Sequence, residues 1–225
     1  PRFASLWIKN NSAPNPNGGG GGIYLENSNS VVQNCEIVYN SANRGGGITI
    51  WTNANPQINN CLIANNTAAD FGGGVEVRFF GHGSTNFYNC TFANNSALAG
   101  GAIALRNNGA EAHIYNSIMW GNLPQQISAN TGTPQVVDVK YSDVQGDLLG
   151  QDIQTGTAIS WGPGNINQDP LFVNTTHFEL GGLSNPCVDA GLNSLVQTSF
   201  DVYRNQRIID GNLDALAVVD MGAIE

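Results

Sequence analysis

The sequence predicts an all-β fold, a parallel β-helix, because three columns of residues recur every 25 to 29 positions. The first column is an apolar residue after a glycine run, the second a cysteine or serine, and the third an asparagine, mostly before Ser-Ala or Thr-Ala. Repeats of this length indicate a solenoid or a propeller, but a propeller blade needs four strands in about 40–45 residues. The three columns are Ile23, Ile48, Val75 and Ile103; Cys35, Cys61, Cys90 and Ser117; and Asn11, Asn40, Asn66, Asn95 and Asn122.

Each repeat contains two or three short strands and no helix. The strands alternate apolar and polar residues with period two, as half-buried strands do. Glycine and asparagine are too frequent for helices, and no stretch of about 12 residues has helical periodicity. Two apolar stacks are therefore expected inside the coils, formed by Ile23, Ile48, Val75 and Ile103, and by Leu25, Ile50, Val77 and Leu105. The strand segments are 22–26, 47–51, 74–78 and 102–106 in one set, and 35–40, 61–66, 90–95 and 117–122 in the other.

The asparagine and glycine columns are expected at opposite corners of the coil. Equivalent residues of stacked coils lie about 4.8 Å apart, so the amides of Asn11, Asn40, Asn66, Asn95 and Asn122 can form an internal ladder. Glycine adopts positive φ or permits close backbone approach where the chain turns. The corner glycines are Gly22, Gly47, Gly74 and Gly101.

The cysteine column predicts buried thiols. Stacked neighbours among Cys35, Cys61 and Cys90 have Cα atoms close enough for a disulfide, but their Cβ vectors should run parallel into the core. We therefore favour free thiols acting as small hydrophobic groups, and the sequence leaves the bridged form open. No cysteine spacing is typical of a zinc site.

Composition excludes several classes of protein. The chain has 225 residues, a formal net charge of −9 and only 11% charged residues, so a basic stripe for nucleic acid is missing. No apolar run reaches the length of a membrane span. The sequence opens at Pro1 in the middle of a repeat, which suggests a processed or truncated product.

The residue pattern of the repeat changes after about residue 130. We assign residues 1–130 to regular coils, and residues 131–225 to the last coils and an irregular C-terminal cap of the same continuous domain. The second part is rich in Pro, Gly, Asn and Asp at short intervals, which indicates turns. Terminal repeats of a solenoid are atypical because they close an exposed edge.

Five C-terminal motifs carry a family resemblance: YSDVQG (141–146), GNINQDPLF (164–172), NPCVDAG (185–191), an Arg before Asp-Gly, and VDMGAIE (219–225). Together they resemble the choice-of-anchor Q domain of bacterial secreted and surface proteins. The glycine runs followed by Asn-Asn-Cys or Tyr-Asn-Cys are similar to polymorphic outer-membrane proteins and the pectin-lyase-like superfamily. The resemblance implies a right-handed parallel β-helix, secreted or displayed at the cell surface, without a defined activity. We expect about six or seven coils in this chain.

No catalytic residue is predicted. Gly81–Gly83 read GHG, as in polygalacturonases, but the coil before it lacks the pair of carboxylates that glycoside hydrolysis needs, so we take His82 as a loop residue. Trp51, Glu76, Arg78 and Arg106 share one outward region and are the candidate glycan contacts, with a Trp–Arg cation–π contact as the structural alternative. An ice-binding face is excluded because no outward column of threonines exists.

No metal or cofactor is predicted in the regular coils. The C-terminal aspartates stand beside Gly or Pro, where the carboxylate usually accepts bonds from backbone N–H groups. A bound calcium ion is the alternative, because calcium takes oxygen-rich loops. Its candidate ligands are Asp189, Asp201, Asp210 and Asp220.

The function predicted is a non-catalytic structural module, extracellular or at the cell surface. Its partners would be copies of itself stacked head-to-tail into a filament or surface layer, or surface polysaccharides and proteins if the module is adhesive. The alternative hypothesis is a carbohydrate-active β-helix, either a polysaccharide lyase or hydrolase or a glycan binder.

Overall fold

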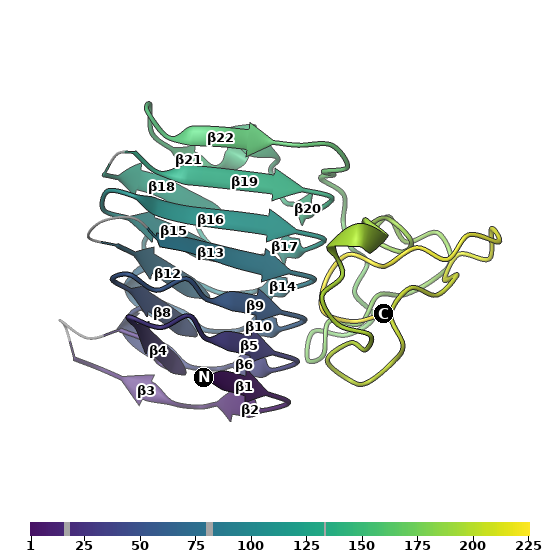
Figure 1. Ribbon diagram of the computed structural model, residues 1–225, viewed down its shortest axis with the longest axis horizontal. Helices are drawn as coiled ribbons and strands as arrows, with labels where there is room; N and C mark the ends of the chain where they lie inside the picture. Colours follow the sequence, from purple (N-terminus) through teal and green to yellow (C-terminus); the bar gives the residue numbers. More distant parts are fainter. Residues whose placement is uncertain (16–18, 80–82, 133) are drawn as a thin grey trace.

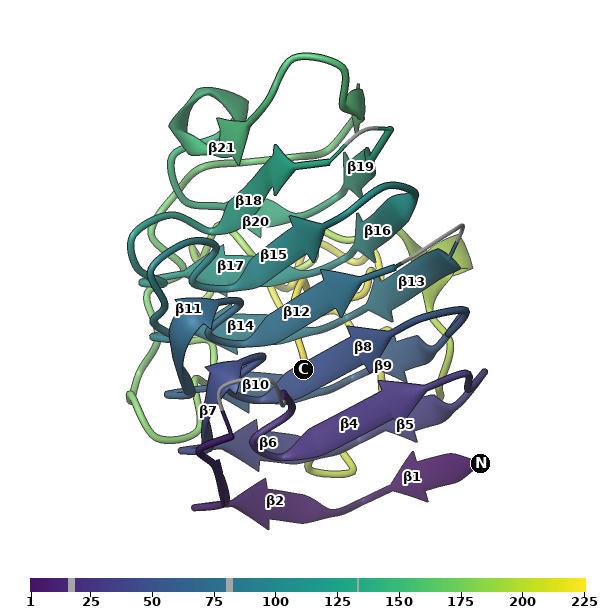
Figure 2. The same cartoon turned by 90° about the vertical axis from the view of Figure 1, so that its left-hand side faces the viewer.

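The computed structural model describes residues 1–15, 19–79, 83–132 and 134–225. The chain winds through parallel strands that stack coil upon coil, as Figure 1 shows. The strands form four sheets, A to D. Each regular coil passes from sheet D through sheet A to sheet B, and the short sheet C lies beside sheet D (Figure 2). The helical content described is two short 3-10 turns, η1 (Leu148–Gly150) and η2 (Asn193–Leu195).

All strand pairs within the four sheets are parallel. Sheet A contains β1 (Arg2–Ala4), β5 (Val31–Gln33), β9 (Gln57–Asn59), β13 (Gly83–Tyr88), β16 (Ala110–Tyr115), β19 (Val136–Lys140) and β22 (Ala158–Trp161). Sheet B contains β2 (Trp7–Lys9), β6 (Glu36–Val38), β10 (Leu62–Ala64), β14 (Thr91–Ala93), β17 (Ile118–Trp120) and β20 (Asp143–Val144). Sheet D contains β4 (Ile23–Glu26), β8 (Ile48–Trp51), β12 (Val75–Arg78), β15 (Ile103–Arg106), β18 (Ile127–Thr131) and β21 (Asp152–Ile153). Sheet C contains β3 (Ser12–Ala13), β7 (Ser41–Arg44) and β11 (Thr67–Phe71).

Five coils carry a strand in each of sheets D, A and B, beginning with β4, β8, β12, β15 and β18. Partial coils lie at both ends. Among the described strands, the first coil, β1 to β3, has no strand in sheet D, and the last coil has β21 in sheet D and β22 in sheet A but no strand in sheet B. The number of complete coils is thus slightly smaller than the six or seven expected.

The expected apolar stacks form the core. Strand pairing sets Val75 beside Ile48 and Ile103, and Val77 beside Ile50 and Leu105. All six side chains are at most 1% exposed. Sheet A adds a further inward stack that includes Ile58, Phe87, Ile114 and Val139, also buried.

The asparagine ladder is present at the corner that follows sheet B. The Oδ1 atom of Asn66 accepts from the backbone N–H and Nδ2 of Asn40, at 2.9 and 3.0 Å. Its Nδ2 donates to the carbonyl of Ile37 and to Oδ1 of Asn95. The same pattern runs from Asn11 at the exposed end to Asn122.

The corner glycines are needed for close approach rather than for positive φ. A Cβ atom on Gly22, Gly47 or Gly74 would lie within 2.9 Å of a carbonyl oxygen of the next coil. Positive φ occurs earlier in each run, as at Gly45 with φ +57°. Gly101 is one residue out of register with this set, because strand pairing places Ala102 in the equivalent position.

The cysteine column is buried, and its thiols are free. Cys61 Sγ lies 3.3 Å from the carbonyl oxygen of Asn59, and Cys90 Sγ lies 3.3 Å from that of Ile58. Ser117 continues the column by accepting the N–H of Cys90 at 3.1 Å. Burial raises the pKa of the Cys90 thiol to about 12 and also raises that of Cys61, so these two thiols act as small core side chains.

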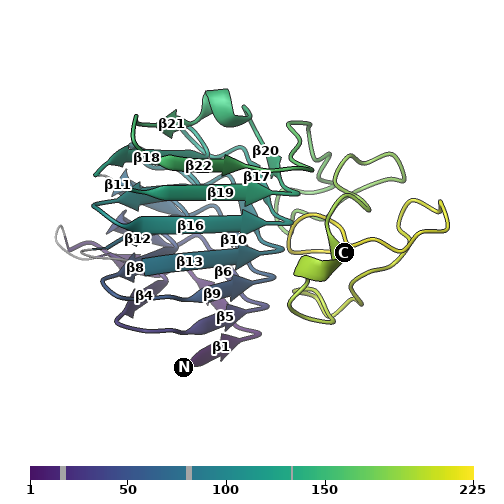
Figure 3. The same cartoon turned by 45° about the horizontal axis from the view of Figure 1, so that its top comes forward.

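The C-terminal part lies in a different place from the cap that we expected. Residues 169–225, here called the flanking segment, run beside sheet B instead of over the last coil (Figures 1 and 3). The cause is that several outward residues of sheet B, such as Val38, Leu62 and Ile118, are apolar. Phe178, Ala223 and Ile224 of the flanking segment bury the outward residues Leu62 and Ala93, among others.

The last coil therefore keeps an open edge. In β22, Ile159 lies above the inward-facing Val137, yet it is 44% exposed. Leu149 of η1 is 98% exposed. Both side chains would be covered if a further coil or another chain lay on this end.

Candidate functional site

The outer face of sheet A presents a cluster of polar and aromatic side chains over β13, β16 and β19. Strand pairing aligns them in two columns. The first column holds Asn86, His113 and Asp138, and the second holds Tyr88, Tyr115 and Lys140. Glu111 stands two residues before His113 on the same face. Figures 1 and 3 show no described segment in front of these strands.

Asp138 is the centre of this cluster. Its Oδ2 atom accepts hydrogen bonds from Lys140 Nζ at 3.0 Å and from the Tyr115 hydroxyl. Burial opposes ionisation of the carboxyl, but hydrogen bonds from Ser160, Tyr115 and Lys140 outweigh it and lower the pKa of Asp138 to about 2. Burial and the bond to Asp138 raise the pKa of the Tyr115 hydroxyl.

His113 lies between two carboxylates. Its Nε2 is 3.6 Å from Glu111 Oε2, and its Nδ1 is 3.5 Å from Asp138 Oδ2. The rings of Tyr88 and Tyr115 stand on successive coils with centroids 5.5 Å apart. All these side chains except Asp138 are partly exposed.

This arrangement suits hydrogen bonding better than proton transfer. A general acid or base works best with a pKa near the working pH, whereas Asp138 is held ionised and Tyr115 protonated. Inverting glycoside hydrolysis needs a water between its two carboxylates, but the His113 imidazole fills the space between Glu111 and Asp138. The cluster offers donors, acceptors and two aromatic rings to a ligand rich in hydroxyl groups.

The four residues named as glycan contacts come together on the outer side of sheet D. Strand pairing sets Arg78 between Trp51 and Arg106. The Arg78 guanidinium lies 4.2 Å from the centroid of the Trp51 ring, and that of Arg106 lies 3.6 Å from the centroid of Phe71. The Trp–Arg contact named as the structural alternative is therefore present.

Glu76 does not fit the glycan-contact hypothesis, because it is 0% exposed. Sheet C and the glycine runs cover its column, where Thr49 Oγ1 donates to the carbonyl of Arg44 at 3.2 Å. The Glu76 carboxylate lies 3.8 Å from Arg106 Nη1, and its oxygens find no hydrogen-bond donor among the described residues. Burial raises the pKa of Glu76 to about 7, against the lowering effect of Arg106, Arg78 and Arg44.

Stability should therefore fall with rising pH through Glu76. Its folded pKa of about 7 exceeds the ordinary 4.5, so the folded state binds more protons than the unfolded state between these values. We expect the free energy of unfolding of the wild type, relative to Glu76→Gln, to drop by up to about 3 kcal/mol from pH 4.5 to pH 8. Urea unfolding at several pH values measures this difference.

Glu26→Gln, which alters an exposed carboxylate of the same sheet, is the control and should follow the wild type. An identical pH profile for both variants would contradict the expectation.

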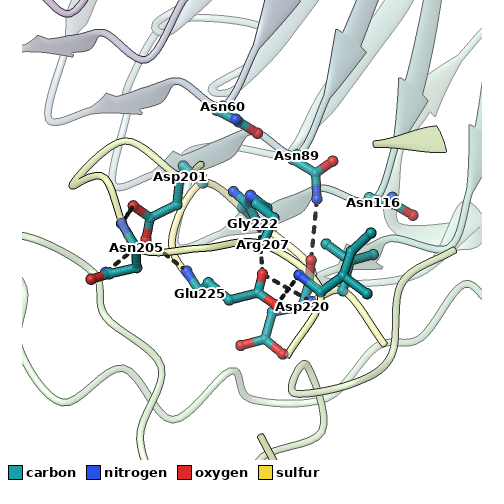
Figure 4. Close-up of polar contacts among 12 residues, drawn as sticks. Asn60, Asn89, Asn116, Asp201, Asn205, Arg207, Asp220, Gly222 and Glu225 are labelled. Atoms are coloured by element: carbon teal, nitrogen blue, oxygen red, sulfur yellow. Dashed lines mark hydrogen bonds and ion pairs between the residues drawn. The ribbon is translucent and has the colours of Figure 1, made fainter. Parts of the chain in front are cut away.

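The four aspartates considered for calcium accept hydrogen bonds within the flanking segment, and Figure 4 shows two of them, Asp201 and Asp220. Asp201 accepts from the backbone N–H groups of Tyr203, Asn205 and Glu225. Asp189, Asp210 and Asp220 likewise accept backbone N–H bonds. Over the described ranges, no three His, Cys, Asp or Glu side chains are placed to hold a metal ion, and the four aspartates form no joint oxygen shell.

A second asparagine column joins sheet A to sheet B and was missed in the sequence. Asn34, Asn60, Asn89 and Asn116 all have φ near +50°. Asn89 Nδ2 donates to the carbonyl of Asp220, and Asn116 donates to and accepts from Leu192. The signal was the asparagine directly before each column cysteine or serine. This column anchors the flanking segment (Figure 4).

The cluster on sheet A was also missed, although one-coil spacing could have found it. The steps from Tyr88 to Tyr115 and from His113 to Asp138 are 27 and 25 residues, which match the repeat. The alignment of His113 with Asp138 becomes visible only when successive coils are compared. His82 lies outside the described residues. In the part of the chain that is described, no helix has the length and apolarity to cross a membrane.

A family model described as "Right handed beta helix region" matches residues 3–119, just over half of the chain. The chain belongs to the right-handed β-helix family. The matched part of this β-helix ends in β17, and the structure continues the same parallel strand pairing as far as β22. Neither the search of curated proteins nor that of solved structures gives a match.

Proposed function

We propose that this β-helix is a non-catalytic module that binds polysaccharide on the outer face of sheet A, in an extracellular or cell-surface setting. The observation that supports the proposal is the cluster around Asp138. Two tyrosine rings on successive coils offer stacking surface, and aromatic groups with a polar end suit ligands that are partly apolar and partly wet. Glu111, His113 and Asn86 add donors and acceptors for hydroxyl groups on the same face.

The test is binding to polysaccharides after loss of the rings. Tyr88→Ala and Tyr115→Ala should each weaken retention in affinity gel electrophoresis about five- to tenfold, because each removes stacking area worth about 1 kcal/mol. Tyr24→Ala, which removes a 45% exposed ring on sheet D, is the matched control and should bind as the wild type does. Equal retention of all three variants, or no retention of the wild type by any polysaccharide, would refute the proposal.

Head-to-tail self-association remains the second candidate, favoured by the open edge at Ile159 and Leu149. Unpaired strand edges are templates for pairing with another chain. Light scattering during size-exclusion chromatography over rising protein concentration distinguishes a fixed mass of one chain from a growing assembly.

A further inference from the structure

The outer face of sheet A carries few charged side chains. Apart from His113, the charged side chains on the described strands of this face are Arg2, Glu111, Asp138 and Lys140. Arg2 stands on the first strand, β1, and donates to Gln33 at 3.1 Å. Lys140 is therefore the one lysine or arginine beside the two tyrosines.

Lys140 is committed to partners of its own. Its Nζ atom lies 3.0 Å from Asp138 Oδ2 and 5.5 Å from the centroid of the Tyr115 ring. Asp138 is only 8% exposed, and a buried carboxylate that loses its partner is costly. A carboxylate or sulfate of a ligand would therefore compete poorly with Asp138 for this lysine.

An acidic polymer would also meet repulsion on this face. Glu111 is partly exposed, and the whole chain has a formal net charge of −9. Like charges in an interface select against a partner even where the shape fits. A neutral polymer does not meet this repulsion, and its hydroxyl groups can use the carboxylates as acceptors.

We infer that the polysaccharide bound on sheet A is uncharged, and that the Asp138–Lys140 pair excludes uronic-acid and sulfated polymers. This inference rests on the proposed function and adds the substrate class. The pair acts as the specificity determinant, because Asp138 takes up the one lysine or arginine that the described strands place beside the tyrosines.

The experiment compares neutral and acidic polymers in the same affinity gels. Mannan and mixed-linkage glucan serve as neutral probes, and polygalacturonate and alginate as acidic probes, at low and moderate salt. The wild type should be retained by at least one neutral polymer at least about tenfold more strongly than by either acidic one. Asp138→Asn frees Lys140 and should raise retention by the acidic polymers about fivefold, an effect that salt screens.

The double variant Asp138→Asn/Lys140→Ala should lose that gain, which separates a freed cation from general loosening of the face. Glu111→Gln, at a partly exposed position, provides a second route and should raise acidic retention about twofold; Glu26→Gln on sheet D should not. Retention of the wild type by acidic polymers that Lys140→Ala abolishes would overturn the inference and leave the proposed function standing. Absence of retention by every polymer would overturn both.

Discussion

Asn66→Ala should lower the free energy of unfolding by about 5 kcal/mol, the largest effect that we expect at a single position. The substitution removes the Oδ1 atom, which accepts two hydrogen bonds from Asn40. It also removes the Nδ2 atom, which donates hydrogen bonds to Ile37 and Asn95. Asn66 is 0% exposed, so water cannot replace these partners. Each buried group left unsatisfied costs about 1–3 kcal/mol, a large part of a typical total of 5–15 kcal/mol.

Chemical unfolding followed by circular dichroism measures this loss. Thr67→Ala changes the exposed neighbour and should cost less than about 0.5 kcal/mol. If Asn66→Ala does not fold, Asn11→Ala at the exposed end of the ladder gives a readable variant with an expected cost of about 1 kcal/mol. A cost at Asn66 no larger than that at Thr67 would show that the ladder does not stabilise the coils.

Arg207→Met should destabilise the flanking segment by about 3–5 kcal/mol. Arg207 Nη1 lies 3.1 Å from Glu225 Oε2, and both side chains are 0% exposed. Arg207 Nη2 also donates to the carbonyl of Gly222 at 2.8 Å, next to Ala223, which covers sheet B. The variant leaves the Glu225 carboxylate buried without its cation, so the segment should separate from sheet B and expose an apolar face.

Binding of a hydrophobic dye and limited proteolysis report this separation, and chemical unfolding gives its free energy. Arg204→Met, three residues earlier and exposed, is the matched control and should behave as the wild type. Arg207→Met/Glu225→Leu should recover part of the loss, because it removes the uncompensated charge. A single variant as stable and as resistant to protease as Arg204→Met would contradict the expectation.

The regular coils could be predicted from the sequence because every coil repeats the same residue pattern. The period of about 27 residues set the register of Ile48, Val75 and Ile103 correctly, and the paired strands have that register. The asparagine ladder followed from the same column, since parallel stacking fixes the distance between equivalent amides. The buried thiols of Cys61 and Cys90 also followed from their place in the column.

The candidate site was harder to predict, because it depends on contacts between neighbouring coils. Glu76 was taken as an outward residue, which is correct for the strand, but sheet C covers it. Glu111 lies beside His113 on the same strand, but the second carboxylate, that of Asp138, stands one coil later. A side chain on the solvent side of a strand can lie free or be covered, and period two alone does not distinguish these cases.

The sequence by itself therefore determined the coil, its register, its inward stacks and the ladder that includes Asn66. These features arise from short-range geometry repeated at a fixed spacing, so one column reports on all coils. Only the tertiary structure decided where residues 169–225 lie and which outward residues are buried. The reason is physical: the flanking segment has no repeat, and its place is set by the apolar outer face of sheet B and by single contacts such as Asn89 with Asp220, across 131 positions of the chain.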